Sequence, residues 1–377
     1  MGAGSDEELM ATAGELAESA RLVTPPNPWV GCVLARDAEI VGRGATGPYP
    51  AGPHAEAAAL RDAGDRARGA TAYVTLEPCD HHGNTPPCSA ALVTAGVARV
   101  VVALEDPDAR VAGSGVARLR AAGIDVSLGT GAESVRWSLA PYLHQRATGR
   151  AFALVKTAMS LDGRTAAADG SSQWITGIEA RADAHRLRAE SQAVVIGAGT
   201  ALADRPQLTV REVDPPVERQ PLRVLLDSRG RVPATGPLFD VSLAPTLVMT
   251  TDAAPAAAVD AWQAAGAKVE TVAPGADGHG VDLVEVLTRL AGSHAVLQAL
   301  IEGGSRLHGA FVDEHLADRV VAYVAPLLLG ARALPAFGGP GPESLAAAAR
   351  WQIGDVTPFG ADVRLTLQPV AHEPEAA

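Results

Sequence analysis

The chain has 377 residues, of which 20% are charged and 47% hydrophobic, and its formal net charge at pH 7 is −12. This length favours two domains, and this composition excludes a wholly disordered chain. The acidic balance argues against non-specific attraction to nucleic acid or membrane, although a few local arginines can still form a phosphate site.

The start of the chain and its cysteines indicate a cytoplasmic protein. The first ten residues, MGAGSDEELM, lack the basic and apolar regions of a signal peptide, and no apolar run is long enough to span a bilayer. Cys32, Cys79 and Cys88 are too few and too unevenly spaced for a disulfide framework. The sequence leaves open whether the protein forms a homo-oligomer.

Helical and strand patterns alternate in the first part of the chain. A capping box of Ser5 and Glu8 precedes apolar residues at helical spacing up to Ala20. The next predicted strands are 30–35, 40–43, 72–76, 99–104 and 124–128, and the next predicted helices are 54–64, 88–95 and 114–122. This alternation predicts an α/β sandwich.

The polar segment 145–150 separates this region from a second alternating region, so we predict one domain over 1–146 and another over 151–372. In the second, the predicted helix is 178–189, and the predicted strands are 152–158, 193–196, 222–226, 246–250, 296–301, 320–324 and 363–367. The stretches 213–221 and 274–280 are typical of surface loops.

A metal-binding pattern is the strongest chemical signal in the sequence. His54 and Glu56 are followed by Cys79 and Cys88, the latter two in a polar, proline-rich stretch that suits a protein core poorly. One imidazole and two thiolates suit Zn²⁺, and three protein ligands leave a fourth position for water, as in catalytic sites. Such an ion generates hydroxide from bound water, and Glu56 is placed to carry protons.

The remaining cysteine and the nearby histidines have simpler interpretations. We interpret Cys32 as a small buried apolar residue. His81 and His82 lie in the same stretch and are alternative zinc ligands. Such loop histidines more often face solvent or substrate, so their role stays open.

H-x-E followed by P-C resembles the cytidine-deaminase-like zinc enzymes, although eight residues separate Cys79 from Cys88 in place of the usual two. With PNPWVGCVL, GPHAEAAAL and AYVTLEPCDHHGNTPPC, the chain resembles the bifunctional riboflavin-biosynthesis deaminase/reductase family over nearly all of residues 20–370. The resemblance implies an α/β/α deaminase domain in which Asn27 contacts the pyrimidine. The implied substrate is 2,5-diamino-6-ribosylamino-4(3H)-pyrimidinone 5′-phosphate.

The second half shows its chemistry less directly. Glycine-rich turns at 197–200 and 302–305 each follow a strand and can present backbone N–H groups to phosphates or simply form tight turns. Neither is a G-x-G-x-x-G fingerprint, so a Rossmann fold is unsupported. Lys156 lies on an apolar strand, where its charge requires an anionic partner unless it reaches the surface. The candidate partners are Asp162, Asp204 and Glu302.

KTAMSLDGRTA, SSQWITG, LDSRGRV and IEGGSRLHGAF resemble the family's reductase domain, which is similar in fold to dihydrofolate reductase. The resemblance implies NADPH-dependent reduction of the ribosyl group to ribityl, with Lys156 and Asp204 implicated in turnover. The positions that match cofactor contacts are Ala158, Trp174, Thr200, Asp204, Ser228, Gly304, Ser305, Arg306, Leu307, His308, Gly309 and Ala310. The positions that match substrate contacts are Ser172, Arg188, Leu208, Arg211 and Glu302.

Arginines add an independent argument about phosphate binding. A guanidinium at Arg188 or Arg211 can hold the 5′-phosphate of the substrate through paired hydrogen bonds. Arg229 or Arg231 can recognise the 2′-phosphate of NADPH. Arg205 replaces an acidic residue of most family members, so it is expected to alter cofactor contacts.

Two other functions remain open at this point. One is a deaminase whose second domain only binds a nucleotide for regulation, which Lys156, Asp204 and Glu302 argue against. The other is a nucleic-acid base deaminase, which the acidic balance and the lack of a basic or aromatic patch disfavour.

Overall fold

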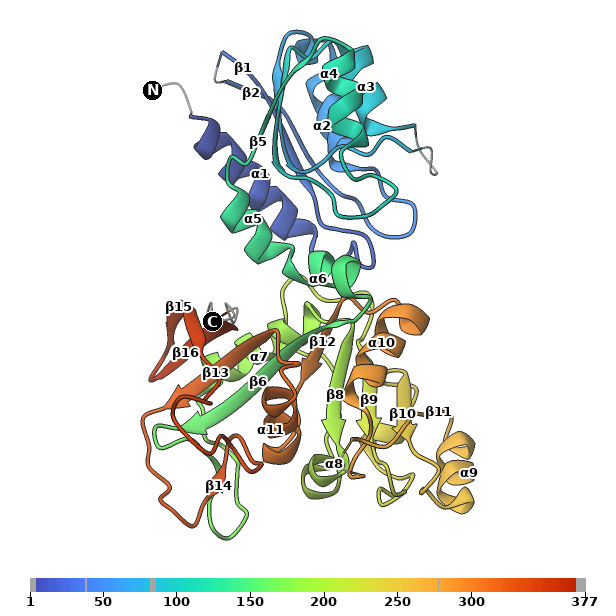
Figure 1. Ribbon diagram of the computed structural model, residues 1–377, viewed down its shortest axis with the longest axis vertical. Coiled ribbons are helices and arrows are strands. Elements are labelled where there is room, and N and C mark those ends of the chain that lie inside the picture. Colours follow the sequence, from blue (N-terminus) through green and yellow to red (C-terminus); the bar gives the residue numbers. More distant parts are fainter. Residues whose placement is uncertain (1–4, 38, 82–85, 277, 371–377) are drawn as a thin grey trace, which may run out of the picture. The chain divides into compact units, whose positions relative to one another are not determined.

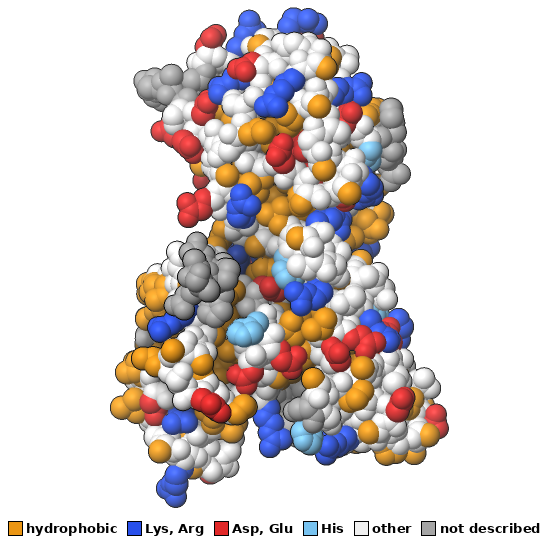
Figure 2. Space-filling model, in the orientation of Figure 1, with side chains coloured by type: hydrophobic (Ala, Val, Ile, Leu, Met, Phe, Trp, Pro, Cys, Tyr) orange, Lys and Arg blue, Asp and Glu red, His pale blue; other side chains and the backbone are white. Residues whose placement is uncertain are grey.

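The structure is a computed structural model that describes residues 5–37, 39–81, 86–276 and 278–370 (Figure 1). It divides into two compact units, Met1–Gly149 and Arg150–Ala377. No helix in these ranges is long and apolar enough to cross a membrane. On the face shown in Figure 2, basic and acidic side chains are interspersed.

The first unit contains a five-stranded sheet in the order β2-β1-β3-β4-β5. Its strands are β1 (Gly31–Arg36), β2 (Glu39–Ala45), β3 (Thr71–Leu76), β4 (Arg99–Leu104) and β5 (Asp125–Leu128). β1 is antiparallel to both β2 and β3, whereas β3, β4 and β5 are parallel. The helices are α1 (Asp6–Ala20), α2 (Ala55–Ala63), α3 (Cys88–Ala95), α4 (Ser114–Ala121), α5 (Ala132–Ser138) and α6 (Ala140–Thr148).

Glycines allow helices to approach both faces of this sheet. A Cβ atom on Gly31 would lie 1.8 Å from the carbonyl oxygen of Ala13 in α1, and one on Gly44 would lie 2.2 Å from that of Ala55 in α2. Gly44 pairs with Cys32, the residue after Gly31, and successive strand residues point to opposite faces. The two helices therefore cover opposite faces, and the predicted three-layer sandwich is confirmed.

The second unit contains a nine-stranded sheet in the order β11-β10-β9-β8-β12-β6-β13-β16-β15. Its strands are β6 (Phe152–Ser160), β8 (Ala193–Gly197), β9 (Leu222–Leu226), β10 (Thr246–Thr250), β11 (Lys268–Thr271), β12 (Gln298–Ile301), β13 (Arg319–Ala325), β15 (Trp351–Phe359) and β16 (Asp362–Pro369). All neighbours are parallel except β13–β16 and β16–β15. A separate pair joins β7 (Arg164–Ala166) to β14 (Leu334–Pro335).

Helices again lie on both faces. They are α7 (Ile178–Ala189), α8 (Ala198–Asp204), α9 (Ala256–Ala264), α10 (Leu283–His294) and α11 (Ser305–Asp313). Val155 of β6 packs in the buried core with Leu287 of α10 and Phe311 of α11. The next residue, Lys156, points to the other face, where Tyr323 of β13 reaches Asp183 of α7.

A fully buried arginine ties the loops beside β9 together. Arg223 of β9 donates to the carbonyl oxygens of four residues and to one hydroxyl. These acceptors belong to Gln207, Pro237, Asp240, Ala244 and Thr246, at distances of 2.5–3.3 Å. Hydrogen bonds, without a carboxylate, thus compensate this buried guanidinium for its lost hydration.

Candidate functional site

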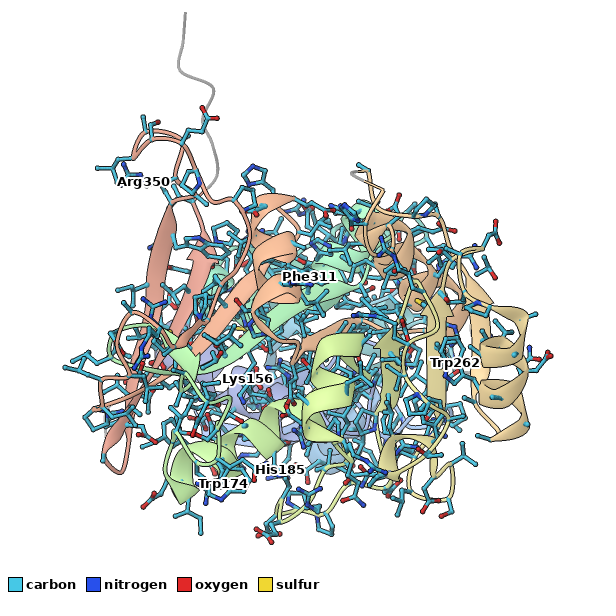
Figure 3. The ribbon with its side chains drawn as sticks, turned by 90° about the horizontal axis from the view of Figure 1, so that it is seen from below. Lys156, Trp174, His185, Trp262, Phe311 and Arg350 are labelled. Atoms are coloured by element: carbon cyan, nitrogen blue, oxygen red, sulfur yellow. The ribbon has the colours of Figure 1, made fainter. Side chains whose placement is uncertain are left out.

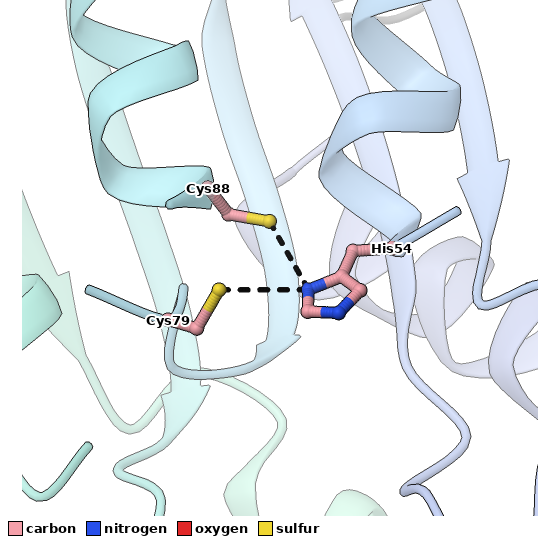
Figure 4. Close-up of side chains that lie close together, drawn as sticks. All are labelled: His54, Cys79 and Cys88. Carbon is pink, nitrogen blue, oxygen red and sulfur yellow. Dashed lines mark hydrogen bonds between the residues drawn. The ribbon is translucent and has the colours of Figure 1, made fainter. Parts of the chain in front are cut away.

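The three predicted metal ligands converge in the first unit (Figure 4). His54 is the N-cap of α2, Cys79 follows β3, and Cys88 is the first residue of α3. The Nδ1 atom of His54 lies 3.5 Å from the Sγ atom of Cys79 and 3.3 Å from that of Cys88.

These distances fit one tetrahedral zinc ion. With Zn–S bonds of about 2.3 Å and Zn–N bonds of about 2.0 Å, a tetrahedral angle separates the nitrogen and sulfur ligands by about 3.5 Å. The two observed separations, 3.5 and 3.3 Å, lie within a few tenths of an ångström of that value. His54 Nδ1, Cys79 Sγ and Cys88 Sγ would therefore hold the ion, with one coordination position left for water.

Backbone contacts position the Cys79 loop. The buried carboxylate of Glu77 accepts hydrogen bonds from the backbone N–H groups of Asp106, Gly113 and Val116, at 3.3, 2.9 and 3.1 Å. The backbone N–H of Ser89, which follows Cys88, donates to the carbonyl oxygen of Cys79 at 3.2 Å. The two cysteines are thus held together by segments that follow the parallel strands β3 and β4 at one edge of the sheet.

Glu56 lies in the first turn of α2 and is 4% exposed. Burial raises its pKa to about 7, which suits a carboxyl group that both accepts and donates protons near neutral pH. Cys32 is fully buried on β1, as expected. Asn27 is exposed, and His81 is half-buried, whereas His82 lies outside the described residues.

In the second unit a cavity of about 1090 Å³ contains many of the predicted site residues. Those in its wall are Ser172, Thr200, Asp204, Ser228, Glu302, Gly304, Ser305, Arg306, Leu307 and Ala310, together with Arg229 and Arg231. Gly304 and Ser305, at the N-terminus of α11, lie in this wall. The free backbone N–H groups of a helix N-terminus are suited to binding phosphate. The wall does not include the described residues Lys156, Ala158, Trp174, Arg188, Leu208, Arg211, His308 and Gly309.

Two residues of α11 support a neighbouring segment. A Cβ atom on Gly309 would lie 1.4 Å from the carbonyl oxygen of Gly338, so only glycine permits this approach. His308 is buried, with Nδ1 3.2 Å from the carbonyl oxygen of Ala336, and burial lowers its pKa to about 4. His308 and Gly309 therefore hold residues 336–338 against the helix that carries Gly304 and Ser305.

Lys156 lies in an electrostatic cluster with one of its three candidate partners. Burial lowers its pKa, and the negative charge of Glu302 opposes that change. Asp162 instead accepts hydrogen bonds from Ser160 and from the backbone of Leu329 and Gly330. Of the three candidates, Glu302 and not Asp162 or Asp204 is the carboxylate whose charge acts on Lys156. Figure 3 shows Lys156 near the centre of this unit.

Arg188 has a partner that the sequence interpretation missed. Its Nε and Nη2 atoms donate to the two carboxylate oxygens of Glu302, at 2.5 and 2.7 Å, and Nη1 donates to the carbonyl oxygen of Thr209 at 3.1 Å. Burial opposes ionisation of Glu302, but Arg188, with a smaller contribution from Lys156, outweighs it and lowers the pKa of Glu302 to about 2. Glu302 is therefore an anion that is hydrogen-bonded to Arg188 and stabilised electrostatically by Lys156.

Further residues near Lys156 gave no signal in the sequence. The Nζ atom of Lys156 lies 5.8 Å from the ring centre of Tyr323, whose hydroxyl donates to Asp183 at 2.6 Å. Asp183 and Tyr323 are 140 positions apart, so only the packing of α7 on β13 reveals the pair. Trp174 is exposed, with the guanidinium of Arg181 4.5 Å from its ring.

Arg205 does not reach the cavity wall formed by the described residues. Its backbone adopts φ of 44°, and its guanidinium lies beside Gly236. Arg205 therefore makes no direct contribution to this wall, although it follows Asp204, which does, and its effect on cofactor contacts stays a prediction.

Comparisons with known proteins match both units. Residues 3–104 match the cytidine and deoxycytidylate deaminase zinc-binding region, and residues 151–365 match the RibD C-terminal domain. Riboflavin biosynthesis protein RibD of Escherichia coli is 42% identical over 373 residues, covering 96% of this chain and 99% of the relative. The same-named protein of Chlamydia trachomatis is 45% identical over 337 residues, covering 88% of both chains.

Solved structures agree over the whole length. Acinetobacter baumannii RibD, form 1, is 40% identical with a TM-score of 0.85, covering 97% of this chain and 99% of that chain. A Thermotoga maritima diaminohydroxyphosphoribosylaminopyrimidine deaminase/5-amino-6-(5-phosphoribosylamino)uracil reductase is 31% identical with a TM-score of 0.83, at the same coverage. These matches confirm the cytidine-deaminase-like fold of the first unit and the dihydrofolate-reductase-like fold of the second.

Proposed function

Because the chain belongs to the RibD family of bifunctional deaminase/reductase enzymes of riboflavin biosynthesis, we propose that it catalyses two consecutive steps on one phosphorylated pyrimidine. The first is hydrolytic deamination of 2,5-diamino-6-ribosylamino-4(3H)-pyrimidinone 5′-phosphate. The second is reduction of the ribosyl group to ribityl with NADPH, which gives 5-amino-6-ribitylamino-uracil 5′-phosphate.

The observation that carries this proposal is the convergence of His54, Cys79 and Cys88 beside the buried Glu56. When bound, a zinc ion supplies a hydroxide nucleophile at neutral pH. Glu56 holds and moves the protons, toward the ring nitrogen and the departing amine. The exposed amide of Asn27 is available to hold the pyrimidine. We propose one zinc ion per chain.

For the reduction, the cavity in the second unit is the proposed NADPH site. When bound, NADPH supplies the hydride for C1′ of the sugar. The turns at Thr200 and at Gly304 and Ser305 offer backbone N–H groups to its phosphates, and Arg229 and Arg231 offer charge to the 2′-phosphate. Asp204 lines the same wall.

Lys156 and Glu302 are the proposed catalytic pair of the reduction. The Lys156 ammonium has no carboxylate within 4.0 Å among the described residues, so its N–H groups are available to the sugar. Glu302 stays ionised because Arg188 and Lys156 flank it, and it can orient a substrate hydroxyl. In the ring-opened imine form of the sugar, hydride addition at C1′ breaks the C=N π bond, and Lys156 would supply the proton that the imine nitrogen takes up.

We further propose that the functional domains are 1–146 and 151–372, which the two compact units support. We also propose that the enzyme works in the cytoplasm, where its three free cysteines stay reduced. A homo-oligomer is compatible with both proposals.

Incubation of the pure protein with the diaminopyrimidine substrate and NADPH tests the proposal, since ammonia release and NADPH oxidation report the two steps separately. Ammonia release without NADPH oxidation would favour a regulatory second domain. NADPH should give a higher kcat/KM than NADH, and equal values would remove the role of Arg229 and Arg231. Deamination of single-stranded nucleic acid, with none of the free pyrimidine, would favour a nucleic-acid enzyme.

A further inference from the structure

His185 of α7 contacts the loop that carries two predicted substrate residues. The backbone nitrogen of Arg211 lies 3.2 Å from the Nδ1 atom of His185. A backbone N–H can only donate, so Nδ1 carries the lone pair and the proton of the neutral ring is on Nε2. The tautomer of His185 is thus fixed by its contact with Arg211.

Neighbouring charges keep this ring neutral. Burial together with the guanidinium groups of Arg188 and Arg211 lowers the pKa of His185 to about 4, and the carboxylates of Glu302 and Glu212 oppose the change only partly. At neutral pH His185 therefore has one N–H donor, at Nε2, and its only acceptor, Nδ1, is already used by the Arg211 N–H.

Thr209 brings the two guanidinium groups to the same place. Its carbonyl oxygen accepts a hydrogen bond from Nη1 of Arg188, and its hydroxyl accepts one from Nη1 of Arg211, both at 3.1 Å. His185 lies one helical turn before Arg188, so their side chains leave the same face of α7. His185, Arg188 and Arg211 therefore surround one short loop, 207–211. Figure 3 labels His185 in this unit.

All three side chains keep donors in reserve. Arg188 has five N–H groups and uses three, two for Glu302 and one for Thr209. Arg211 uses only Nη1 among the side-chain bonds of the described residues, on Gln207 and Thr209. Nε2 of His185 has no hydrogen bond within the described part of the chain. Together, Arg188, Arg211 and His185 therefore have more unused N–H groups than a single ligand oxygen could accept.

We propose that His185 is a third phosphate-binding residue of the reductase, donating its Nε2–H to the 5′-phosphate of the substrate beside Arg188 and Arg211. This inference rests on the proposed reduction of a phosphorylated pyrimidine. A phosphate monoester has three terminal oxygens, which match donors of two guanidinium groups and one imidazole. None of the three residues belongs to the wall of the 1090 Å³ cavity, whereas Glu302, which Arg188 binds, does. The proposed phosphate site therefore lies beside the proposed cofactor site and not within it.

The neutral imidazole suits this position. A third full cation beside Arg188 and Arg211 would repel its neighbours, whereas an N–H dipole contributes a hydrogen bond without that cost. The same ring also anchors the Arg211 backbone, so a test must separate the donor Nε2–H from the anchor Nδ1.

His185→Asn makes this separation, because the asparagine oxygen can accept from the Arg211 N–H while nothing replaces Nε2–H. His294→Asn is the matched control on α10, where the His294 side chain pairs with Glu270 at 3.0 Å. Steady-state reduction is measured with the phosphorylated deaminated intermediate and with its dephosphorylated counterpart, alongside NADPH KM and ammonia release.

The expected result for His185→Asn is a KM for the phosphorylated intermediate raised about 10- to 100-fold, the loss of one hydrogen bond to a charged group. We expect kcat, the NADPH KM, ammonia release and kcat/KM for the dephosphorylated compound to change less than about twofold, as for His294→Asn. An unchanged KM for the phosphorylated intermediate would overturn the proposal. So would an equal loss with both compounds, which would make His185 a loop anchor only. Failure of the unaltered enzyme to oxidise NADPH would instead refute the proposed reduction.

Discussion

Replacing Arg188 by methionine should strongly destabilise the second unit. The substitution keeps an unbranched side chain in α7 but removes the paired hydrogen bonds to Glu302 and the bond to the Thr209 carbonyl oxygen. Glu302 is then left as a largely buried carboxylate, 9% exposed, with Lys156 as its remaining cationic neighbour. Removing one partner of a buried ion pair typically costs about 3–5 kcal/mol.

The pKa of Glu302 gives a similar magnitude. Its fall from 4.5 to about 2 corresponds to about 3 kcal/mol, at about 1.4 kcal/mol for each tenfold change in acidity. For a unit of this size, 1 kcal/mol shifts Tm by about 2–4 °C. Arg188→Met should therefore lower the Tm of the second unit by roughly 6–20 °C.

Calorimetry of the full-length protein measures this shift, and loss of NADPH oxidation by the unaltered enzyme on heating identifies which transition belongs to the second unit. Arg186→Met is the control, two residues away on α7, where an exposed arginine pairs with Glu190 at 3.1 Å. Such surface pairs contribute about 0.3–0.5 kcal/mol, so the shift should stay below about 2 °C. Equal Tm values for the two variants would refute the buried-pair reasoning. Glu302→Met added to Arg188→Met should recover part of the loss.

The remaining predictions concern pH and the two activities. Because the folded-state pKa of Glu302 is depressed, its stabilisation is present above pH 4.5 and lost as pH falls toward about 2, and acid unfolding of Glu302→Gln should lack this component. Glu56→Gln should lower ammonia release about 10²–10⁴-fold while externally supplied deaminated intermediate is still reduced; loss of both would indicate one composite site. Cys88→Ser should lose most of the bound zinc found by metal analysis, and full retention would remove Cys88 from the ligand set. Lys156→Ala should depress reduction and spare ammonia release, whereas an unchanged rate of reduction would make Lys156 structural.

The ligand set could be predicted from the sequence because its donors lie in short motifs with strong local signals. His54 precedes a helix that ends at Gly64, and Cys88 opens a helix that ends at Gly96, as the capping pattern indicates. The predicted strands 99–104, 222–226 and 246–250 match β4, β9 and β10, since fully buried strands carry continuous apolar runs.

The other features of the fold and of the second site depend on contacts between residues that are far apart in the sequence. The polar run 145–150 indicates a boundary, yet residues up to Thr148 continue α6, which ends at Gly149 with φ of 72°. β15 was not predicted, because an exposed edge strand with alternating half-buried positions lacks an apolar run. Arg188 suggested a phosphate ligand, but its bond to Glu302 spans 114 positions and is revealed only by the packing of α7 in the folded unit.

Arg223 has a consequence for how this family of sequences can diverge. Four of its five acceptors are main-chain carbonyl oxygens, which every residue type possesses. The loops around residues 207 and 237–244 can therefore exchange their side chains freely during evolution, provided that their length and backbone path persist. The arginine itself has no such freedom, because no other side chain carries as many donors in one plane. One fixed residue on a strand thereby permits variation in the two loop regions that it joins.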